Sequence, residues 1–143
     1  MKHPEELITE PTRRTPWIVM EPGRIFIMGR SIPENPGEFY RSIYEWIINH
    51  SSSYDDMTRI DAGFEYINTT STKWIFTILR ELSVKPGLAG KVKVNWYYEK
   101  GDDDMCELGY IFKSLLDCPF YIIEVGGMTK SVYDSILAEP VPD

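Results

Sequence analysis

A run of four hydroxyl residues, Thr69 to Thr72, is the part of this chain best suited to covalent modification. It follows Tyr66-Ile67-Asn68 and precedes Lys73, where an alternating apolar pattern typical of a strand changes to a helical one. The first amides of a helix have no partner within the helix and lie at the positive end of its dipole. An anion attached to one of these hydroxyls would therefore be stabilised.

The hydroxyl run has two interpretations. As an N-cap, one Ser or Thr oxygen accepts a hydrogen bond from an early helix amide, and losing such a cap costs ~0.5 to 2 kcal/mol. As a regulatory phosphorylation site, the run would bring ~1.5 to 2 negative charges and three acceptor oxygens to those amides. The local sequence on its own favours the cap, yet one cap accounts for one hydroxyl out of four.

The composition predicts a single globular domain over residues 1–143, with a core of about 7–125 and a C-terminal tail of 126–143. Of its residues 43% are hydrophobic and 26% are charged. With 15 basic against 22 acidic residues the net charge is −7, which argues against nucleic acid or an anionic membrane as partner. No segment approaches the ~18 apolar residues of a membrane span. We expect a cytoplasmic protein without membrane insertion, in which Cys106 and Cys118 are reduced.

The sequence lacks the common catalytic motifs, so we expect a protein without enzymatic activity and without a cofactor. His3 lies near the N-terminus and His50 at an expected helix end, and the chain contains no nucleophile elbow, Walker loop or dinucleotide fingerprint. One metal hypothesis remains open, because carboxylates gather in one loop. A solvated, helix-capping loop is the favoured alternative, since the spacing differs from that of a calcium loop. These carboxylates are Glu99, Asp102, Asp103, Asp104 and Glu107.

Apolar periodicity predicts an α/β fold with the order ββαβαβαβ. The strands are expected over 17–20, 24–28, 59–67, 91–98 and 119–125, and the helices over about 36–49, 70–84 and 103–116. Asn35 suits the N-cap of the first helix, and Asp104 with Glu107 is spaced like a capping box for the third. The result is a mixed sheet, an N-terminal antiparallel hairpin followed by parallel strands, with about three helices and a topology that resembles the STAS type. We expect the tail to be disordered or to lie across the surface.

Four segments together resemble the SiaC family of bacterial regulatory phosphoproteins, over about residues 7–125. The segments are Thr12-x-x-Thr15-Pro16, Gly29-Arg30-Ser31-Ile32-Pro33-Glu34-Asn35 with Phe39-Tyr40, Tyr66-Ile67-Asn68-Thr69-Thr70-Ser71-Thr72-Lys73, and Trp96-Tyr97-Tyr98-Glu99 with Asp102-Asp103-Asp104. Separated motifs in the same order and spacing are harder to match by chance than any one of them.

The resemblance implies a switch. In that family the Thr after the Asn of the Tyr-x-Asn-Thr-Ser-Ser motif is phosphorylated by a dedicated kinase and dephosphorylated by a PP2C-type phosphatase. The unphosphorylated form binds and activates a diguanylate cyclase in c-di-GMP and biofilm signalling. The matching residue is Thr69, and Thr70 stands where the family commonly has Ser, as a second candidate acceptor. The residues then expected to contact partners are Asn68, Thr70, Ser71, Lys73, Arg30, Pro33, Glu34 and Asn35.

Alternatives to this interpretation stay open at the level of sequence. The 31–36 loop could simply close a hairpin and cap a helix. Trp96 and Tyr98 could be core residues instead of recognition residues. The stripe of Tyr40, Tyr44 and Ile48 could be an exposed apolar patch for a partner or the second side of a packed helix. The chain could also be an interaction module that needs no phosphorylation, or a metal-dependent enzyme that uses the acidic loop.

Overall fold

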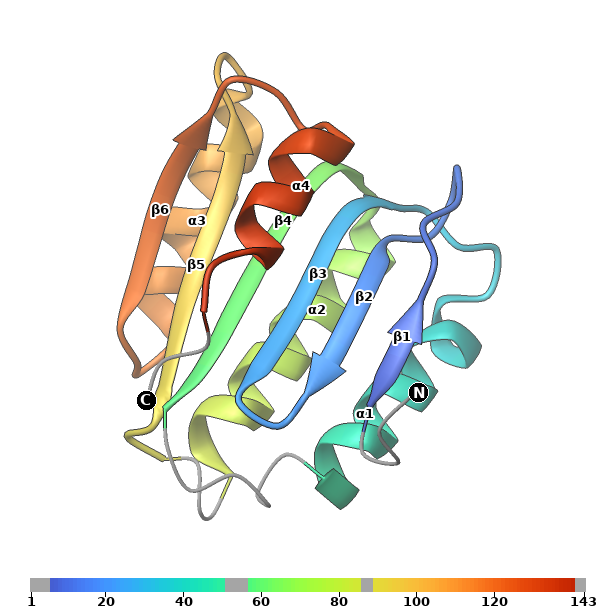
Figure 1. Ribbon diagram of the computed structural model, residues 1–143, viewed down its shortest axis with the longest axis vertical. Coiled ribbons are helices and arrows are strands. Elements are labelled where there is room, and N and C mark those ends of the chain that lie inside the picture. Colours follow the sequence, from blue (N-terminus) through green and yellow to red (C-terminus); the bar gives the residue numbers. More distant parts are fainter. Residues whose placement is uncertain (1–5, 51–56, 86–88, 141–143) are drawn as a thin grey trace.

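The computed structural model describes residues 6–50, 57–85 and 89–140. These residues form a mixed sheet of six strands and four α-helices (Figure 1). The strands are β1 (Leu7–Thr9), β2 (Trp17–Glu21), β3 (Arg24–Ser31), β4 (Thr58–Ile67), β5 (Val92–Glu99) and β6 (Phe120–Val125). The helices are α1 (Pro36–His50), α2 (Thr69–Val84), α3 (Asp103–Leu115) and α4 (Lys130–Leu137). The predicted α/β class is confirmed.

The six strands of the described sheet lie side by side in the order in which they follow one another along the chain. β1, β2 and β3 pair antiparallel, whereas β3 to β6 pair parallel and are connected through α1, α2 and α3. The predicted hairpin with following parallel strands is therefore correct. β1 was not predicted, because three residues are too few to show an alternating pattern.

The main core lies between the sheet and the three helices α1, α2 and α3, which cover one face in Figure 1. Its largest side chains include Trp96 and Phe64, both fully buried. Trp96 is thus a core residue, and Tyr98 is half-buried beside it. The stripe on α1 is divided in the same way: Tyr40 is fully buried, whereas Ile48 is exposed.

The C-terminal tail contains α4, which lies across the opposite face of the sheet (Figure 1). Tyr133 and Ile136 of α4 are buried against Phe26 and Met28 of β3 and Tyr97 of β5. The expected order ββαβαβαβ therefore lacked both this helix and β1. A short helix after two glycines carries only about two turns of periodicity, so its apolar positions did not stand out in the sequence.

A buried polar network attaches the end of α4 to the sheet. Arg24, which is 4% exposed, donates hydrogen bonds to the backbone carbonyls of Leu137 and Glu139. Arg59 pairs with both the Glu139 carboxylate and the buried Asp61, whose second oxygen accepts a hydrogen bond from the Tyr97 phenol at 3.0 Å. Burial and the adjacent Asp61 carboxylate raise the pKa of Tyr97. Each buried charge has a partner, as the cost of desolvation requires.

Two cap predictions have different outcomes. The Asn35 side-chain oxygen accepts a hydrogen bond from the Glu38 amide at 3.3 Å, as expected for the start of α1. At the start of α3 the predicted capping box of Asp104 and Glu107 is wrong, because Asp102 is the N-cap and accepts from the Met105 amide at 3.1 Å. Three acidic residues in succession make the register of such a cap ambiguous in the sequence.

Further predictions from the sequence concern the two cysteines, membrane-spanning helices and the two histidines. Cys106 and Cys118 are both free thiols. Burial and the neighbouring Asp117 raise the pKa of the Cys118 thiol. No helix in the described part of the chain combines the length and apolar character that a membrane crossing needs. His3 and the side chain of His50 lie outside the described residues.

Candidate functional site

The hydroxyl run lies where β4 ends and α2 begins, next to the end of β3. The β3 and β4 strands are parallel, with Ser31 beside Ile67, and the Asn68 amide donates to the Ser31 carbonyl at 3.1 Å. This contact joins the 31–35 loop to the start of α2. The carboxyl ends of adjacent parallel strands meet at one edge of a sheet, which is where α/β folds commonly place their functional residues.

Asn68, and not a hydroxyl residue, caps α2. Its side-chain oxygen accepts a hydrogen bond from the Ser71 amide at 2.8 Å, and its backbone carbonyl accepts from the Thr72 hydroxyl at 2.9 Å. The interpretation of the hydroxyl run as an N-cap is therefore wrong by one position. Thr69 is the first residue of the helix and has no capping role that competes with modification.

The four hydroxyl side chains differ in exposure. Thr69 and Thr70 are exposed, Thr72 is half-buried, and Ser71 is fully buried. The side chains of Thr69 and Thr70 are therefore open to solvent. Ser71 was expected to contact a partner, and the structure corrects this, because a side chain sealed inside the fold presents nothing to another protein.

The first turn of α2 leaves positive potential beside Thr69. Within the described residues, the amides of Thr69 and Thr70 have no protein acceptor, since the Asn68 cap occupies only the Ser71 amide. The first turn of this 16-residue helix carries no acidic residue to offset its dipole. An anion at Thr69 would meet free amides and an uncompensated helix end.

A buried aromatic and hydroxyl cluster holds that first turn in place. The Tyr40 phenol of α1 shares a hydrogen bond with the Ser31 hydroxyl and lies next to Ser71. Its ring stacks on Trp74 of α2, with centroids 6.0 Å apart and planes 13° from parallel. Burial raises the pKa of Tyr40 to about 12, so it stays protonated at neutral pH.

Charged side chains lie at the end of β3 and in the segments beside it. Arg30 donates to the Arg13 carbonyl at 3.0 Å and pairs with Glu65 at 3.6 Å, whereas Arg14 pairs with Glu34 at 3.6 Å. Such solvated pairs each contribute only ~0 to 1 kcal/mol, so a stronger anion can displace their carboxylates. The arginines are thus available to an incoming ligand.

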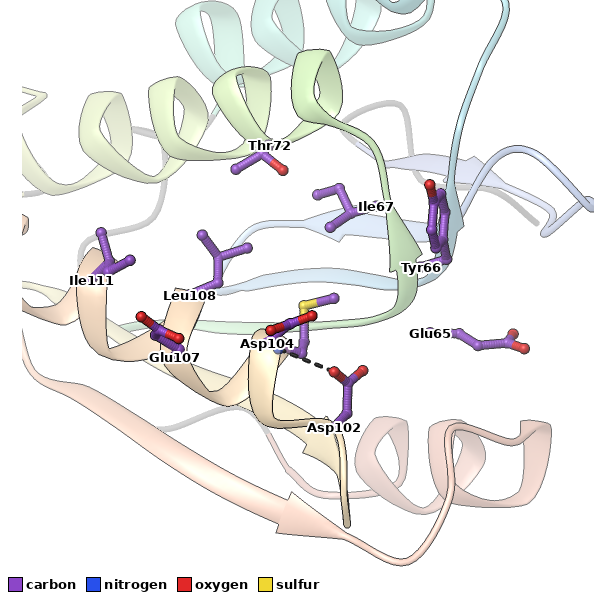
Figure 2. Close-up of a pocket in the computed structure, with 10 residues that line it drawn as sticks. Glu65, Tyr66, Ile67, Thr72, Asp102, Asp104, Glu107, Leu108 and Ile111 are labelled. Carbon is purple, nitrogen blue, oxygen red and sulfur yellow. Dashed lines mark hydrogen bonds between the residues drawn. The ribbon is translucent and has the colours of Figure 1, made fainter.

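A groove opens on the other side of the hydroxyl run, between the N-terminal ends of α2 and α3. We call it the α2–α3 groove (Figure 2). Its volume is about 350 Å³. In Figure 2, Ile67 and Leu108 point into it, while Asp104 and Glu107 line it from α3. The lining residues are Glu65, Tyr66, Ile67, Thr72, Asp102, Asp104, Met105, Glu107, Leu108 and Ile111.

The acidic loop does not gather into a metal centre. Across 6–50, 57–85 and 89–140, no three His, Cys, Asp or Glu side chains are placed so that they could hold one ion. Asp102 caps α3, and the Glu99 carboxylate accepts a hydrogen bond from the Met128 amide at 3.3 Å. These two carboxylates act on the backbone, which matches the helix-capping interpretation of the loop.

Comparison with known proteins decides the family. Residues 9–125 match the family described as SiaC family regulatory phosphoprotein. The chain belongs to the SiaC family. It is also 27% identical, over 113 residues, to an uncharacterised protein of Pseudomonas aeruginosa strain UCBPP-PA14, covering 78% of this chain and 90% of that protein.

Solved SiaC structures share this fold. SiaC of Pseudomonas aeruginosa superposes with a TM-score of 0.73 at 27% identity, covering 84% of this chain and 98% of SiaC. A second solved structure is the complex of the diguanylate cyclase SiaD with its activator SiaC, also from Pseudomonas aeruginosa. Its matching chain superposes with a TM-score of 0.73 at 27% identity, covering 83% of this chain and 99% of that chain. The α4 helix lies beyond the residues that match the SiaC family.

The structure brings most of the expected site residues to one end of the sheet. Asn68, Thr70 and Lys73 start α2, and Arg30 lies on the adjacent strand, before the loop that leads to α1. Glu34 and Asn35 are exposed in that loop, whereas Pro33 is buried and supports the loop from within. The α2–α3 groove was not predicted from the sequence. The two helices that form its walls each follow a parallel strand, and this pattern places the starts of both helices at one edge of the sheet.

Proposed function

We propose that this SiaC family member is a regulatory phosphoprotein controlled by reversible phosphorylation of Thr69. Its unphosphorylated form binds and activates an effector such as a diguanylate cyclase, in c-di-GMP signalling that governs biofilm formation. The observation that carries the proposal is the exposed Thr69, first residue of a helix whose early amides are free in the described structure. Family membership and the complex of SiaC with SiaD support the choice of effector.

The fold can accept a phosphate on Thr69 without rearrangement. The modified side chain would be solvent-exposed at the positive end of α2, where no acidic residue competes for the amides. The Asn68 cap, the bond between Tyr40 and Ser31 and the buried Ser71 do not involve the Thr69 side chain, so they can persist when it is modified. The phosphate therefore changes the surface and leaves the core as it is.

The effector surface in this proposal lies around the start of α2 and the end of β3. Its residues are Asn68, Thr70, Lys73, Arg30, Glu34 and Asn35. Arg30 and Lys73 give this surface cationic groups that suit acidic side chains of the effector. A phosphate on Thr69 adds bulk and ~1.5 to 2 negative charges there, one turn from Lys73 on α2, and repels acidic groups. Docking is hindered without refolding.

A dedicated Ser/Thr kinase and a PP2C-type phosphatase complete the proposed cytoplasmic cycle. Thr69 is the primary acceptor, and Thr70 is a secondary one because it is exposed as well. The protein itself acts by binding and performs no catalysis. A module that binds the effector regardless of phosphorylation would use the same surface, and the experiment below separates the two.

The test uses purified full-length chain and the diguanylate cyclases of its source organism, assayed one by one for c-di-GMP production. We expect the wild type to activate at least one cyclase, Thr69→Glu to lose most of that activation, and Thr69→Ala to keep it. Thr77→Glu is the matched control, because Thr77 is an exposed threonine further along α2.

Two outcomes would count against the proposal. If no cyclase responds to the unmodified protein, the effector is of another class. If wild type and Thr69→Glu activate equally, the module without phosphorylation is the better description. Mass spectrometry of the protein isolated from its own cells provides an independent check, since phosphate should be found on the peptide that contains Thr69.

A further inference from the structure

The α2–α3 groove has an acidic wall that the proposed effector surface does not use. None of its ten described lining residues is Lys or Arg. Asp102 is engaged as the cap of α3, and Glu65 pairs with Arg30. Asp104 and Glu107 are exposed and have no ion pair among the described residues. The side chains that line the groove therefore include acidic ones without an ion pair and no basic one.

An apolar stripe extends the groove along α3. Leu108 and Ile111 line the groove, and Leu115 follows one turn later on the same face. Ile111 is 46% exposed and Leu115 is 63% exposed. At 1.5 Å of rise per residue, the stripe is about 10 Å long. This length exceeds a single side chain and matches two turns of a helix that packs alongside α3.

We propose that the α2–α3 groove binds an amphipathic helix of a protein partner whose apolar side chains are flanked by Lys and Arg, and that this binding strengthens when Thr69 is phosphorylated. The apolar side chains of the helix cover Ile67, Leu108 and Ile111. Its cations meet Asp104 and Glu107, which lie three residues apart on α3 and so on the same side of that helix. This is the recognition mode in which an amphipathic helix places its apolar face in a groove, with charge complementarity selecting the partner.

The coupling to Thr69 follows from helix geometry. Thr69 and Thr72 are three residues apart on α2, so their side chains lie on the same face of the first turn. Thr72 lines the groove, which places Thr69 at its edge. A phosphate there adds to the negative charge that attracts a cationic helix. The same phosphate weakens the binding of an effector that docks on the adjacent cationic surface. This second half of the inference rests on the proposed function, whereas the binding of a cationic helix does not.

The test titrates the full-length protein with three synthetic helical peptides of about 18 residues, a length at which helix formation is favourable. All three carry the same apolar positions, flanked by Lys and Arg, by Gln or by Glu. Methyl NMR of Ile67, Leu108 and Ile111 reports occupancy of the groove. We expect only the basic peptide to shift these methyl signals, and we expect added salt to weaken its binding.

Two variants test the carboxylates. The double variant Asp104→Asn with Glu107→Gln should lower the affinity for the basic peptide about threefold to tenfold, because two solvated charge contacts are lost. Glu45→Gln with Asp117→Asn removes the same charge at exposed positions outside the groove and should leave affinity nearly unchanged. Circular dichroism confirms that each variant is folded. Thr69→Glu should raise the affinity for the basic peptide about twofold.

Each outcome has a defined meaning. The binding half is overturned if no peptide shifts the groove methyl signals, if the acidic peptide binds as well as the basic one, or if both double variants lose affinity equally. The coupling half is overturned if Thr69→Glu binds the basic peptide no better than the wild type does. Because the titration needs neither kinase nor cyclase, its failure is distinguishable from failure of the proposed function in the cyclase assay.

Discussion

The side-chain oxygen of Asn68 accepts a hydrogen bond from the backbone amide of Ser71 at 2.8 Å. Replacement of Asn68 by Ala removes the acceptor and should lower the free energy of unfolding by ~0.5 to 2 kcal/mol. Asn68→Asp keeps an acceptor and adds negative charge at the helix end, so it should restore most of the loss. Urea denaturation followed by circular dichroism measures the difference.

Asn49→Ala is the control for that series, since Asn49 is an exposed residue in the last turn of α1. It should change the free energy of unfolding by less than ~0.5 kcal/mol. An unfolding free energy for Asn68→Ala equal to that of the wild type would mean that water replaces the cap without loss.

Gly109 of α3 is buried against the Trp96 ring of β5. A methyl group added there would be 2.5 Å from Cδ1 and 2.8 Å from Nε1 of the buried Trp96 ring. The Trp96 Nε1 also donates to the Met105 carbonyl at 3.0 Å, so the ring cannot shift without loss of that bond. Overpacking costs ~1 to 3 kcal/mol, and Ala recovers up to ~1 kcal/mol of helix propensity. We expect Gly109→Ala to destabilise the protein by ~1 to 2 kcal/mol.

Tryptophan fluorescence and thermal unfolding measure this effect of Gly109→Ala. Gly126→Ala is the control, because no heavy atom lies within 4 Å of the added methyl group there. A melting temperature for Gly109→Ala at or above that of the wild type would show that α3 can move away from β5 at little cost.

Tyr133 attaches α4 to the second face of the sheet. It is 8% exposed, and its ring meets Phe26 edge-on with centroids 6.5 Å apart. Tyr133→Ala should lower the free energy of unfolding by ~3 kcal/mol, because large buried side chains cost ~3 to 5 kcal/mol when truncated. Hydrogen exchange should quicken first in α4. Ser135→Ala, on the exposed side of the same helix, should leave exchange in α4 unchanged.

The pKa of Tyr40 predicts loss of stability at alkaline pH. Burial raises this pKa to about 12, above the ~10 expected in the unfolded chain. The folded state therefore favours the protonated phenol, and the resulting stability is complete below pH ~10 and is lost as pH rises from there to about 12. Tyr40→Phe cannot ionise, so its free energy of unfolding should fall less steeply in this range, although the bond to Ser31 is lost at every pH.

Denaturation of the wild type and Tyr40→Phe at several pH values between 8 and about 11 compares the two slopes. Parallel slopes would show that Tyr40 is not a group whose ionisation opposes folding. Tyr97 contributes in the same direction, since its pKa is also raised by burial, and it remains in both proteins.

The sequence was sufficient for the five longer strands and three longer helices because each has enough residues to show its period. The strand that ends at Ile67 and the helix that begins at Thr69 were both found, and with them the candidate phosphorylation site. The resemblance to SiaC then selected Thr69 among four hydroxyls. Local periodicity alone could not make that choice, because each hydroxyl suits a helix start.

What the sequence could not show depends on contacts between distant segments. The cap of α2 is the side chain of Asn68 because its register is set by the bond to Ser31 on β3. The attachment of α4 depends on Arg24, more than 100 residues earlier in the chain. The α2–α3 groove exists only once the ends of β4 and β5 are placed side by side, so neither of its walls indicated a groove by itself.

The charge of the first turn of α2 gives a last prediction that involves no partner. The turn carries no acidic residue, and Thr69 is its first position. Thr69→Glu should therefore raise the free energy of unfolding by ~0.3 to 1 kcal/mol through the helix dipole, at low ionic strength. Thr77→Glu, in the middle of the helix, should not do so, and its difference from the wild type should stay near zero. If Thr69→Glu instead destabilises the protein, the start of α2 does not stabilise a negative charge, and Thr70 becomes the better candidate for phosphorylation.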